Sequence, residues 1–294
     1  MRSEERLGWA LSLPGLAVIS AIAVFPIGWT AWESLHVHDL RMPWLGRPFV
    51  GLANYAEALS SPRFWDAMAH TAVFTAVTVT VELIGGLFLA LIVDRISRGR
   101  DLVRTTVLLP WAIPTVVVAL VWRFLFENPA GLVNAVLFRL GMSSPTWFAD
   151  ATAAWVPLML ADAWKMTPFV AVLLLAGLQS IDRSLYEAAR IDGAGWGRQL
   201  TALTLPLLRP ALLVAFIFRT LDAIRVFDVI YVMTGGGPGT ATEPIALLTF
   251  SMLLQNLRFG FGAALSMIVF AVTFVLAVVF IRVLGRDALT GRVA

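Results

Sequence analysis

Six long apolar stretches constrain the fold of this chain more than any other feature of its sequence. They cover roughly residues 8–32, 69–93, 103–126, 152–178, 207–233 and 259–282. A helix needs about 20 mostly apolar residues to cross a bilayer, and each stretch is long enough. Hydrophobic residues make up 59% of the 294 residues and charged residues only 14%, which is more apolar surface than a soluble core of this size can bury. The sequence therefore predicts an all-α, polytopic membrane protein with six transmembrane helices.

The first stretch has the position of a signal peptide. Its apolar run is longer than the about 7–15 residues of a signal-peptide core, so we expect an uncleaved span. Prolines lie inside several of the six stretches, at positions 14, 26, 110, 114, 157 and 168. Proline removes a helix hydrogen bond, so these positions predict kinks whose freed carbonyls are satisfied by neighbouring helices or water.

The distribution of arginine predicts the orientation of the chain. Thirteen arginines lie in one alternating set of segments between the stretches, and five lie in the opposite set. Cytoplasmic loops carry the excess of basic residues, so both termini are predicted to be cytoplasmic. Segment 36–66 and the turn 234–239 are then external. The turn reads Thr-Gly-Gly-Gly-Pro-Gly and is expected to place glycine at positive φ.

Composition and missing motifs argue against several classes of function. The net charge of +3 is too small to suggest nucleic-acid binding. Cysteine is absent, and His36 and His38 have no third ligand nearby, so we expect no metal. Neither H-E-x-x-H nor G-x-S-x-G occurs, which argues against an intramembrane enzyme. The only lysine, Lys165, lies inside an apolar stretch and no phosphate-binding loop is present, so ATP would have to bind to another chain.

Segment 179–206 is predicted to begin with a short helix on the cytoplasmic face. Ser184 and Glu187 have the S-x-x-E spacing of a capping box, which predicts a helix that starts at Leu185. Gly193 suits the left-handed position that often follows the last turn of a helix.

A second short helix is predicted from about residue 196 to residue 203, ended by Pro206. Ala188 and Ala189 give the first helix a small-residue surface. The segment is thus either a plain helical connection or a surface that another protein can approach closely.

The same segment resembles the EAA loop of the membrane subunits of bacterial ABC importers. That pattern is Glu-Ala-Ala, three residues, Gly, nine residues and then Ile-x-Leu-Pro. This chain matches it at every position except one, where Leu203 replaces isoleucine. The resemblance implies contact with an ATPase for Glu187, Ala188, Ala189, Asp192, Gly193, Leu205 and Pro206.

Three further stretches resemble one branch of that family, the importers of maltose, trehalose, glycerol 3-phosphate and related solutes. They read Gly-Leu-Ala-Asn-Tyr at 51–55, Leu-Pro-Trp-Ala-Ile-Pro at 109–114 and Thr-Gly-Gly-Gly-Pro at 234–238. The resemblance covers nearly the whole chain and implies the type I ABC importer fold. It implies an N-terminal part at 1–66, a five-helix core at 67–285 and a cytoplasmic tail at 286–294.

The resemblance also implies a function and a set of partners. It implies a permease subunit of the bacterial inner membrane that has no cofactor and catalyses no covalent reaction. A second homologous membrane subunit would complete a heterodimer, two ATPase subunits would dock at the EAA loop, and an extracytoplasmic binding protein would deliver a di- or oligosaccharide. Glycerol 3-phosphate or another small solute is the alternative substrate.

Ionisable residues lie near the middle of three stretches. Glu82 lies in the second, Asp162 and Lys165 in the fourth, and Arg219 and Asp222 in the fifth. A charge at a helix centre costs about 2.5–3.5 kcal/mol on insertion scales, so these groups must face one another or water. Asp162 and Lys165 have i,i+3 spacing and are expected to pair. A ladder of alternating charge is also expected at every third residue, at Arg219, Asp222, Arg225 and Asp228.

These charges either lock the helix bundle or line the translocation path, since transporter sites usually lie near the bilayer midplane. Segment 162–169 resembles the part of the larger maltose-importer membrane subunit that touches sugar. Trp164, Phe169 and Phe227 are candidates for stacking on sugar rings. The candidate path residues are Asp162, Trp164, Lys165, Met166, Phe169, Arg219, Asp222 and Arg225. Because aspartates offset the arginines, we favour a neutral sugar over glycerol 3-phosphate.

Two other transport classes are open alternatives. In a secondary transporter driven by an ion gradient, the intramembrane carboxylates would bind protons or sodium. A channel is the second alternative. Neither class needs an ATPase-docking helix, so segment 184–206 argues against both.

Overall fold

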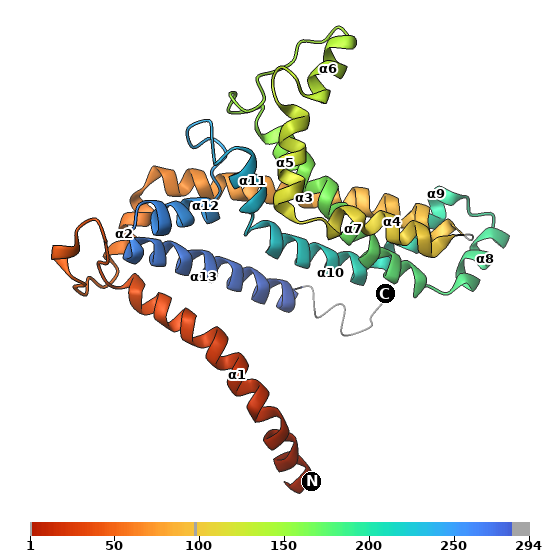
Figure 1. Cartoon of the computed structure of the whole chain (residues 1–294). Coiled ribbons are helices and arrows are strands. Elements are labelled where there is room, and N and C mark those ends of the chain that lie inside the picture. The colour runs from red at the N-terminus through yellow and green to blue at the C-terminus, as the bar shows by residue number, and fades with distance from the viewer. Residues whose placement is uncertain (1, 97–98, 284–294) are drawn as a thin grey trace. The chain divides into compact units, whose positions relative to one another are not determined.

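The computed structural model describes residues 2–96 and 99–283, so the predicted tail at 286–294 lies outside the described residues. Every regular element of this part is helical, which confirms the predicted all-α fold (Figure 1). The α-helices are α1 Arg2–Ser34, α2 Ala53–Ser60, α3 Pro62–Arg95, α4 Arg100–Ala112, α5 Thr115–Phe126, α6 Leu132–Arg139, α7 Trp155–Gln179, α8 Arg183–Ile191, α9 Trp196–Gln199, α10 Leu205–Ala223, α11 Asp228–Met233, α12 Ile245–Phe250 and α13 Phe259–Val283. A 3₁₀ turn covers Pro43–Leu45, and π-helical turns cover Leu200–Thr204 and Ser251–Gln255.

Five helices of the described residues are long and apolar enough to cross a membrane, and one bent pair raises the number to six. The five are Leu11–Ser34, Pro62–Arg95, Trp155–Gln179, Trp196–Ala223 and Phe259–Arg282. The bent pair consists of α4 and α5. The predicted six spans are therefore confirmed when this pair counts as one.

The third predicted span is not a straight helix. Its two halves, 105–112 and 115–126, meet at 90°. Ile113 between them is extended, with ψ of 134°, which is the conformation that a residue before proline prefers. Pro114 has no N–H with which to continue the helix. Proline thus predicted a kink at this place, but its presence alone does not give the size of the bend.

The fifth predicted span begins earlier and ends sooner than expected. One continuous helix runs from Trp196 to Ala223, through α9, the π-helical turn Leu200–Thr204 and α10. Pro206 does not end the second short helix, because the wider π-helical turn before it leaves room for a residue that has no N–H. The helix instead stops at Ala223, with Ile224 as its C-cap residue. Helix α11 starts four residues after Ile224, at Asp228.

The chain divides into two compact units. Among the described residues, the first consists of 2–65 and 248–272, and the second of 66–96, 99–247 and 273–283. In the first unit, the predicted loop at 36–66 contains α2 as well as turns. The Asn54 side-chain amide donates to the carbonyls of Ser34 at 2.8 Å and His36 at 3.0 Å, and the Tyr55 hydroxyl lies 2.6 Å from that of Ser34. The Gly-Leu-Ala-Asn-Tyr stretch therefore fastens the loop to the end of α1.

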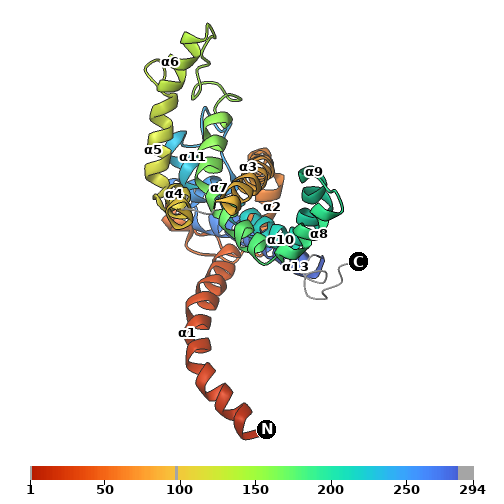
Figure 2. The same cartoon turned by 90° about the vertical axis from the view of Figure 1, so that its right-hand side faces the viewer.

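In the second unit, α7 is the central helix (Figures 1 and 2). Its buried residues pack in one apolar core with residues of α3 and α10, among them Ala90, Val170, Leu174 and Leu208. A Cβ on Gly86 of α3 would lie 2.6 Å from a methyl carbon of Val170, so glycine is needed for the two helices to approach this closely. This packing fixes the places from which the polar side chains of α3, α7 and α10 project.

Two connecting segments of the second unit, which contain short helices, lie far apart. Helix α6 and the pair α8 and α9 are at different ends of the unit in both views (Figures 1 and 2). The glycine turn at 234–239 has positive φ at Gly235, Gly236 and Gly239, as the sequence predicted.

Candidate functional site

Three carboxylates surround one arginine in the interior of the second unit. We call Arg219 of α10, Glu82 of α3, Asp162 of α7 and Asp222 of α10 the Arg219 cluster. Arg219 Nη2 lies 2.8 Å from a Glu82 oxygen and 3.1 Å from an Asp162 oxygen, and the guanidinium also donates to Asp222 and again to Glu82. Arg219 and Glu82 are 1% and 0% exposed. The expectation that these midspan charges compensate one another is thus confirmed for four of the groups.

Lys165 does not pair with Asp162 as the i,i+3 spacing suggested. Its Nζ donates to the backbone carbonyl of Ile113 at 2.6 Å and to that of Trp111 at 3.1 Å. These carbonyls lie at the end of α4, where the break at Pro114 removes their helical partners. Lys165 of α7 therefore stabilises the bend between α4 and α5.

The Lys165→Met variant is expected to unfold more easily than the natural protein. It leaves two carbonyls without their donor, and each such loss costs about 1–3 kcal/mol when the group is buried. A denaturing-detergent titration of the purified protein measures the change in the free energy of unfolding. Arg225→Met is the matched control, since Arg225 is exposed and its Nε donates to the Leu221 carbonyl, four residues before it in the chain. An equal loss in both variants would contradict the assigned role of Lys165.

The predicted ladder of charges on the fifth span forms at Arg219 and Asp222 but is wrong for Arg225 and Asp228. The helix ends at Ala223, so Arg225 and Asp228 no longer follow Arg219 and Asp222 on one helix face. Arg225 is exposed, and its Nε donates to the carbonyl of Leu221 at 3.1 Å. In the described structure, Arg225 is not part of the Arg219 cluster. Neither Gly nor Pro lies between Ala223 and Asp228 to locate this break.

The candidate aromatic residues have neighbours of their own. The Phe169 ring stacks on Trp111 with centroids 5.7 Å apart, and the Phe227 ring stacks on Tyr231 at 5.2 Å. The Trp164 and Trp122 rings lie side by side with centroids 6.2 Å apart, and 43% of the Trp164 surface is exposed. Met166 is half-buried on the same helix. Trp164 is thus more exposed than Phe169, the other aromatic residue of segment 162–169.

Helix α8 begins earlier than predicted. Its N-cap residue is Asp182, whose carboxylate accepts the backbone N–H of Ser184 at 2.9 Å. The same bond holds the pKa of Asp182 below its usual range. The predicted capping box of Ser184 and Glu187 is therefore wrong, although the helix is present. Aspartate caps helices as well as serine does, so Asp182 was an equally good signal.

The end of α8 agrees with the prediction. Gly193 has φ of +76°, its N–H donates to the Arg190 carbonyl at 3.0 Å, and the N–H of Ala194 donates to the Ala189 carbonyl at 2.8 Å. This pair of bonds is the Schellman motif. Glycine fits here because a Cβ disfavours positive φ. The chain direction after α8 is thus set by Gly193.

Further bonds hold the two helices of the segment together. The Gln199 amide donates to the Ala194 carbonyl at 2.7 Å, and the hydroxyls of Tyr186 and Thr204 lie 3.1 Å apart. Leu205 and Pro206 follow in the first turn of α10 and are half-buried. Sequence reasoning missed Tyr186 and Thr204, which have no local pattern that predicts their contact.

The surface of α8 is open. Within the described structure no residue of this nine-residue helix is buried, and Ile191 is 87% exposed. Glu187, Ala188 and Asp192 are exposed, and Ala189 is half-buried. Isolated helices shorter than about 12–15 residues are marginal in water, so the caps at Asp182 and Gly193 matter for this one. The arrangement is a capped, preformed helix that is exposed at the surface of the second unit.

Comparison with known proteins assigns this chain to a family. Residues 82–290 match the family model described as the inner membrane component of binding-protein-dependent transport systems. The trehalose/maltose transport system permease protein MalF of Thermococcus litoralis is 44% identical over 96% of this chain and 95% of that protein. The trehalose transport system permease protein SugA of Mycobacterium tuberculosis is 39% identical over 97% of this chain and 91% of that protein.

Among solved structures, a bacterial ABC transporter that imports the acidic polysaccharide alginate has the same fold. Its TM-score is 0.82 at 22% sequence identity, over 97% of this chain and 96% of that chain. This likeness gives the chain the type I ABC importer transmembrane fold. Together with the family match, it shows that the chain belongs to the inner membrane components of binding-protein-dependent transport systems, as the non-catalytic permease subunit of an ABC importer.

Proposed function

We propose that this permease carries a neutral di- or oligosaccharide across the membrane. Its 44% identity to a trehalose/maltose permease over nearly the whole chain supports a sugar. The pairing at midspan supports a neutral one, because the Arg219 guanidinium is already paired with Glu82, Asp162 and Asp222. A buried cation with its partners in place is poorly suited to receive a phosphorylated or acidic solute.

The candidate path residues divide into two roles. Asp222, whose side chain is 55% exposed, and Trp164 are open enough to receive a sugar hydroxyl and a sugar ring face. Arg219 is buried and holds Asp222, and Lys165 is buried and holds the bend between α4 and α5. Three candidates are half-buried, namely Asp162, Met166 and Phe169. Arg225 is exposed and is a path candidate only by its place in the sequence.

We infer that the chain works in the cytoplasmic membrane of a bacterium as part of a larger complex. A second homologous membrane subunit completes a heterodimer, and two ATPase subunits dock at the exposed surface of α8 and its partner-subunit counterpart. An extracytoplasmic binding protein delivers the sugar. In this arrangement residues 1–66 form the N-terminal span and external loop, residues 67–285 the core, and residues 286–294 a cytoplasmic tail.

The orientation of the chain is directly testable, because the natural sequence has no cysteine. Single-cysteine variants at Gly46 and Gly237 are expected to react with a membrane-impermeant maleimide in intact cells. Variants at Gly99 and Gly195 are expected to react only after the cells are opened, since the excess of arginine lies on that side. Labelling of Gly195 in intact cells would contradict a cytoplasmic α8.

Uptake by the complete complex tests the substrate. Proteoliposomes that contain both membrane subunits, the ATPase and the binding protein are expected to accumulate labelled trehalose or maltose when ATP is inside. The Trp164→Ala variant is expected to lower that uptake, while Trp44→Ala in the exposed external loop should leave it unchanged. Accumulation of glycerol 3-phosphate alone would contradict a neutral sugar. Uptake driven by an ion gradient without ATP would support a secondary transporter instead.

A further inference from the structure

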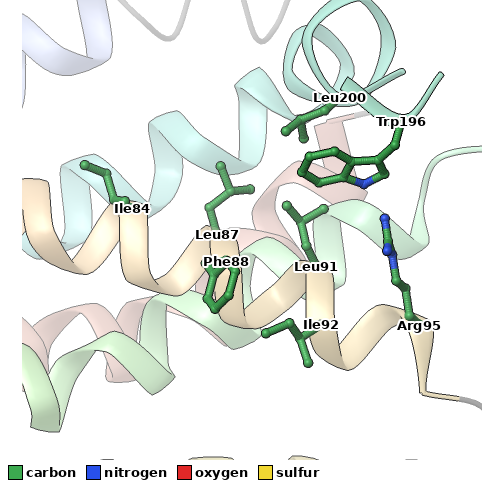
Figure 3. Close-up of a pocket in the computed structure, with 8 residues that line it drawn as sticks. All are labelled: Ile84, Leu87, Phe88, Leu91, Ile92, Arg95, Trp196 and Leu200. Carbon is green, nitrogen blue, oxygen red and sulfur yellow. The ribbon is translucent and has the colours of Figure 1, made fainter. Parts of the chain in front are cut away.

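An apolar groove lies on the surface of the second unit, between the second half of α3 and the start of the long helix α9–α10. Four of its residues are strongly exposed, namely Ile84, Phe88, Ile92 and Trp196, at 66%, 67%, 43% and 59%. Figure 3 shows that α3 supplies most of the lining and that α9 and the π-helical turn close one end. The lining residues are Ile84, Leu87, Phe88, Leu91, Ile92, Arg95, Trp196 and Leu200.

The charge of this groove is confined to one end. Arg95 is the one ionisable residue among the described lining residues, and it lies in the last turn of α3. Its guanidinium carbon is 5.6 Å from the centre of the Trp196 ring, and Figure 3 shows the two side chains facing each other. A cation–π contact of this kind holds the guanidinium in place without neutralising it. The groove therefore has an apolar body and a positioned positive head.

The dimensions of the groove match one leaflet of a bilayer. Ile84 and Arg95 are about 11 residues apart on α3, which corresponds to about 16 Å along the helix axis. Half of a hydrocarbon core of about 30 Å is about 15 Å. Tryptophan and arginine are the residues that gather where a span meets the cytoplasmic surface. The end at Arg95 and Trp196 thus has both the chemistry and the depth of the headgroup region.

We propose that this groove binds one phospholipid of the cytoplasmic leaflet with an anionic headgroup. The phosphate lies at Arg95 and an acyl chain lies along Leu87, Phe88 and Leu91. Basic sites at helix ends on the cytoplasmic side are suited to such headgroups. The inference rests on the orientation proposed above, in which α8 and α9 are cytoplasmic.

The position of the site connects the lipid with the ATPase-docking segment. Trp196 follows the Gly193 turn by three residues and starts the helix that continues into α10. A lipid seated between Leu91 and Trp196 joins α3 to the segment that carries α8. We therefore expect substrate-stimulated ATP hydrolysis by the complete complex to be greater in bilayers that contain anionic lipid.

Retention of lipid by the purified complex tests this site. The complete complex is placed in nanodiscs of equal parts phosphatidylglycerol and phosphatidylcholine, then extracted, and native mass spectrometry counts the bound lipids. The natural complex is expected to retain phosphatidylglycerol in preference to phosphatidylcholine. Arg95→Gln is expected to lower that preference about fivefold, because one basic group near an anionic membrane surface contributes about 1 kcal/mol. Arg95→Lys should retain most of it.

A second variant and a control separate the groove from general lipid contact. Leu91→Trp fills the groove and is expected to lower retention of both lipids without changing any charge. Arg282→Gln removes a basic residue at the end of another span, α13, and should leave the preference unchanged. Equal phosphatidylglycerol preference in the natural, Arg95→Gln and Arg282→Gln complexes would overturn the proposal.

Cross-linking identifies any other occupant. A photoreactive residue at position 92 is expected to attach to phospholipid, and attachment to the second membrane subunit would overturn the proposal. Neither measurement uses sugar or ATP, so failure of the lipid site leaves the substrate assignment standing. The cysteine labelling at Gly195 tests the shared orientation separately.

Discussion

The Arg219→Met variant is expected to lose about 3–5 kcal/mol of folding free energy, because it leaves Glu82 buried without its cation. Glu82 and Asp162 would then face each other in the interior with no compensating charge. A denaturing-detergent titration of the purified chain gives the free energy of unfolding. The amount of full-length protein in the membrane should fall in parallel.

Two matched variants show whether this loss comes from the pairing with Glu82. Asp222→Asn removes a partner whose side chain is 55% exposed, so it should cost much less than Arg219→Met. The double variant Arg219→Met with Glu82→Gln should recover part of the loss, with a coupling energy above about 1 kcal/mol. Equal costs for Arg219→Met and Asp222→Asn, or strict additivity in the double variant, would contradict the central place of Arg219.

The Gly193→Asp variant is expected to abolish stimulation of ATP hydrolysis by substrate while the chain still inserts. Its effect is on the direction of the chain, because φ of +76° disfavours any residue with a Cβ and the Schellman motif depends on that conformation. In the described structure no neighbouring heavy atom lies within 4 Å of a Cβ at this position, so a clash inside the subunit is not the cause. Retention of the ATPase and substrate-stimulated hydrolysis by the purified complex are the readouts.

Gly195 provides a control two residues away. It has φ of −68°, and a Cβ there also meets open space within the described structure. Gly195→Asp introduces the same side chain without backbone strain and should keep most of the stimulation. Gly193→Ala isolates the strain from the added charge and should show a weaker form of the Gly193→Asp defect. Normal uptake by Gly193→Asp would mean that segment 184–206 is only a connection.

The sequence was most informative where hydrophobicity or glycine decides the structure. The apolar stretches predicted the long helices, because hydrophobic length is what a bilayer selects. Gly193 predicted the end of α8, because few other residues adopt its backbone conformation. Buried charges predicted a compensating cluster, because unpaired charge is costly in the membrane.

Long-range contacts explain the errors. Lys165 was expected to pair with the nearest acid on its own helix, but the broken end of α4 supplies two carbonyls from 52 and 54 residues away. Likewise, Glu82 contributes to the Arg219 cluster from 137 residues away. The ladder at 219–228 formed only at Arg219 and Asp222, because the helix ends at Ala223 and no Gly or Pro nearby marks that end in the sequence.

The π-helical turn at 200–204 lies between the segment that carries α8 and the midspan charges, and it admits one extra residue into the helix that joins them. An α-helix turns by about 100° per residue, and a π-helical turn contains about one residue more than the α-helical turn it replaces. Deleting one residue within 200–204 would therefore leave a regular α-helix from Trp196 onward and keep Arg219 in nearly the same rotation relative to Trp196. Such a deletion is expected to preserve the contact between Arg219 and Glu82, whereas deleting one residue within 207–218 would rotate Arg219 by about 100° relative to Trp196.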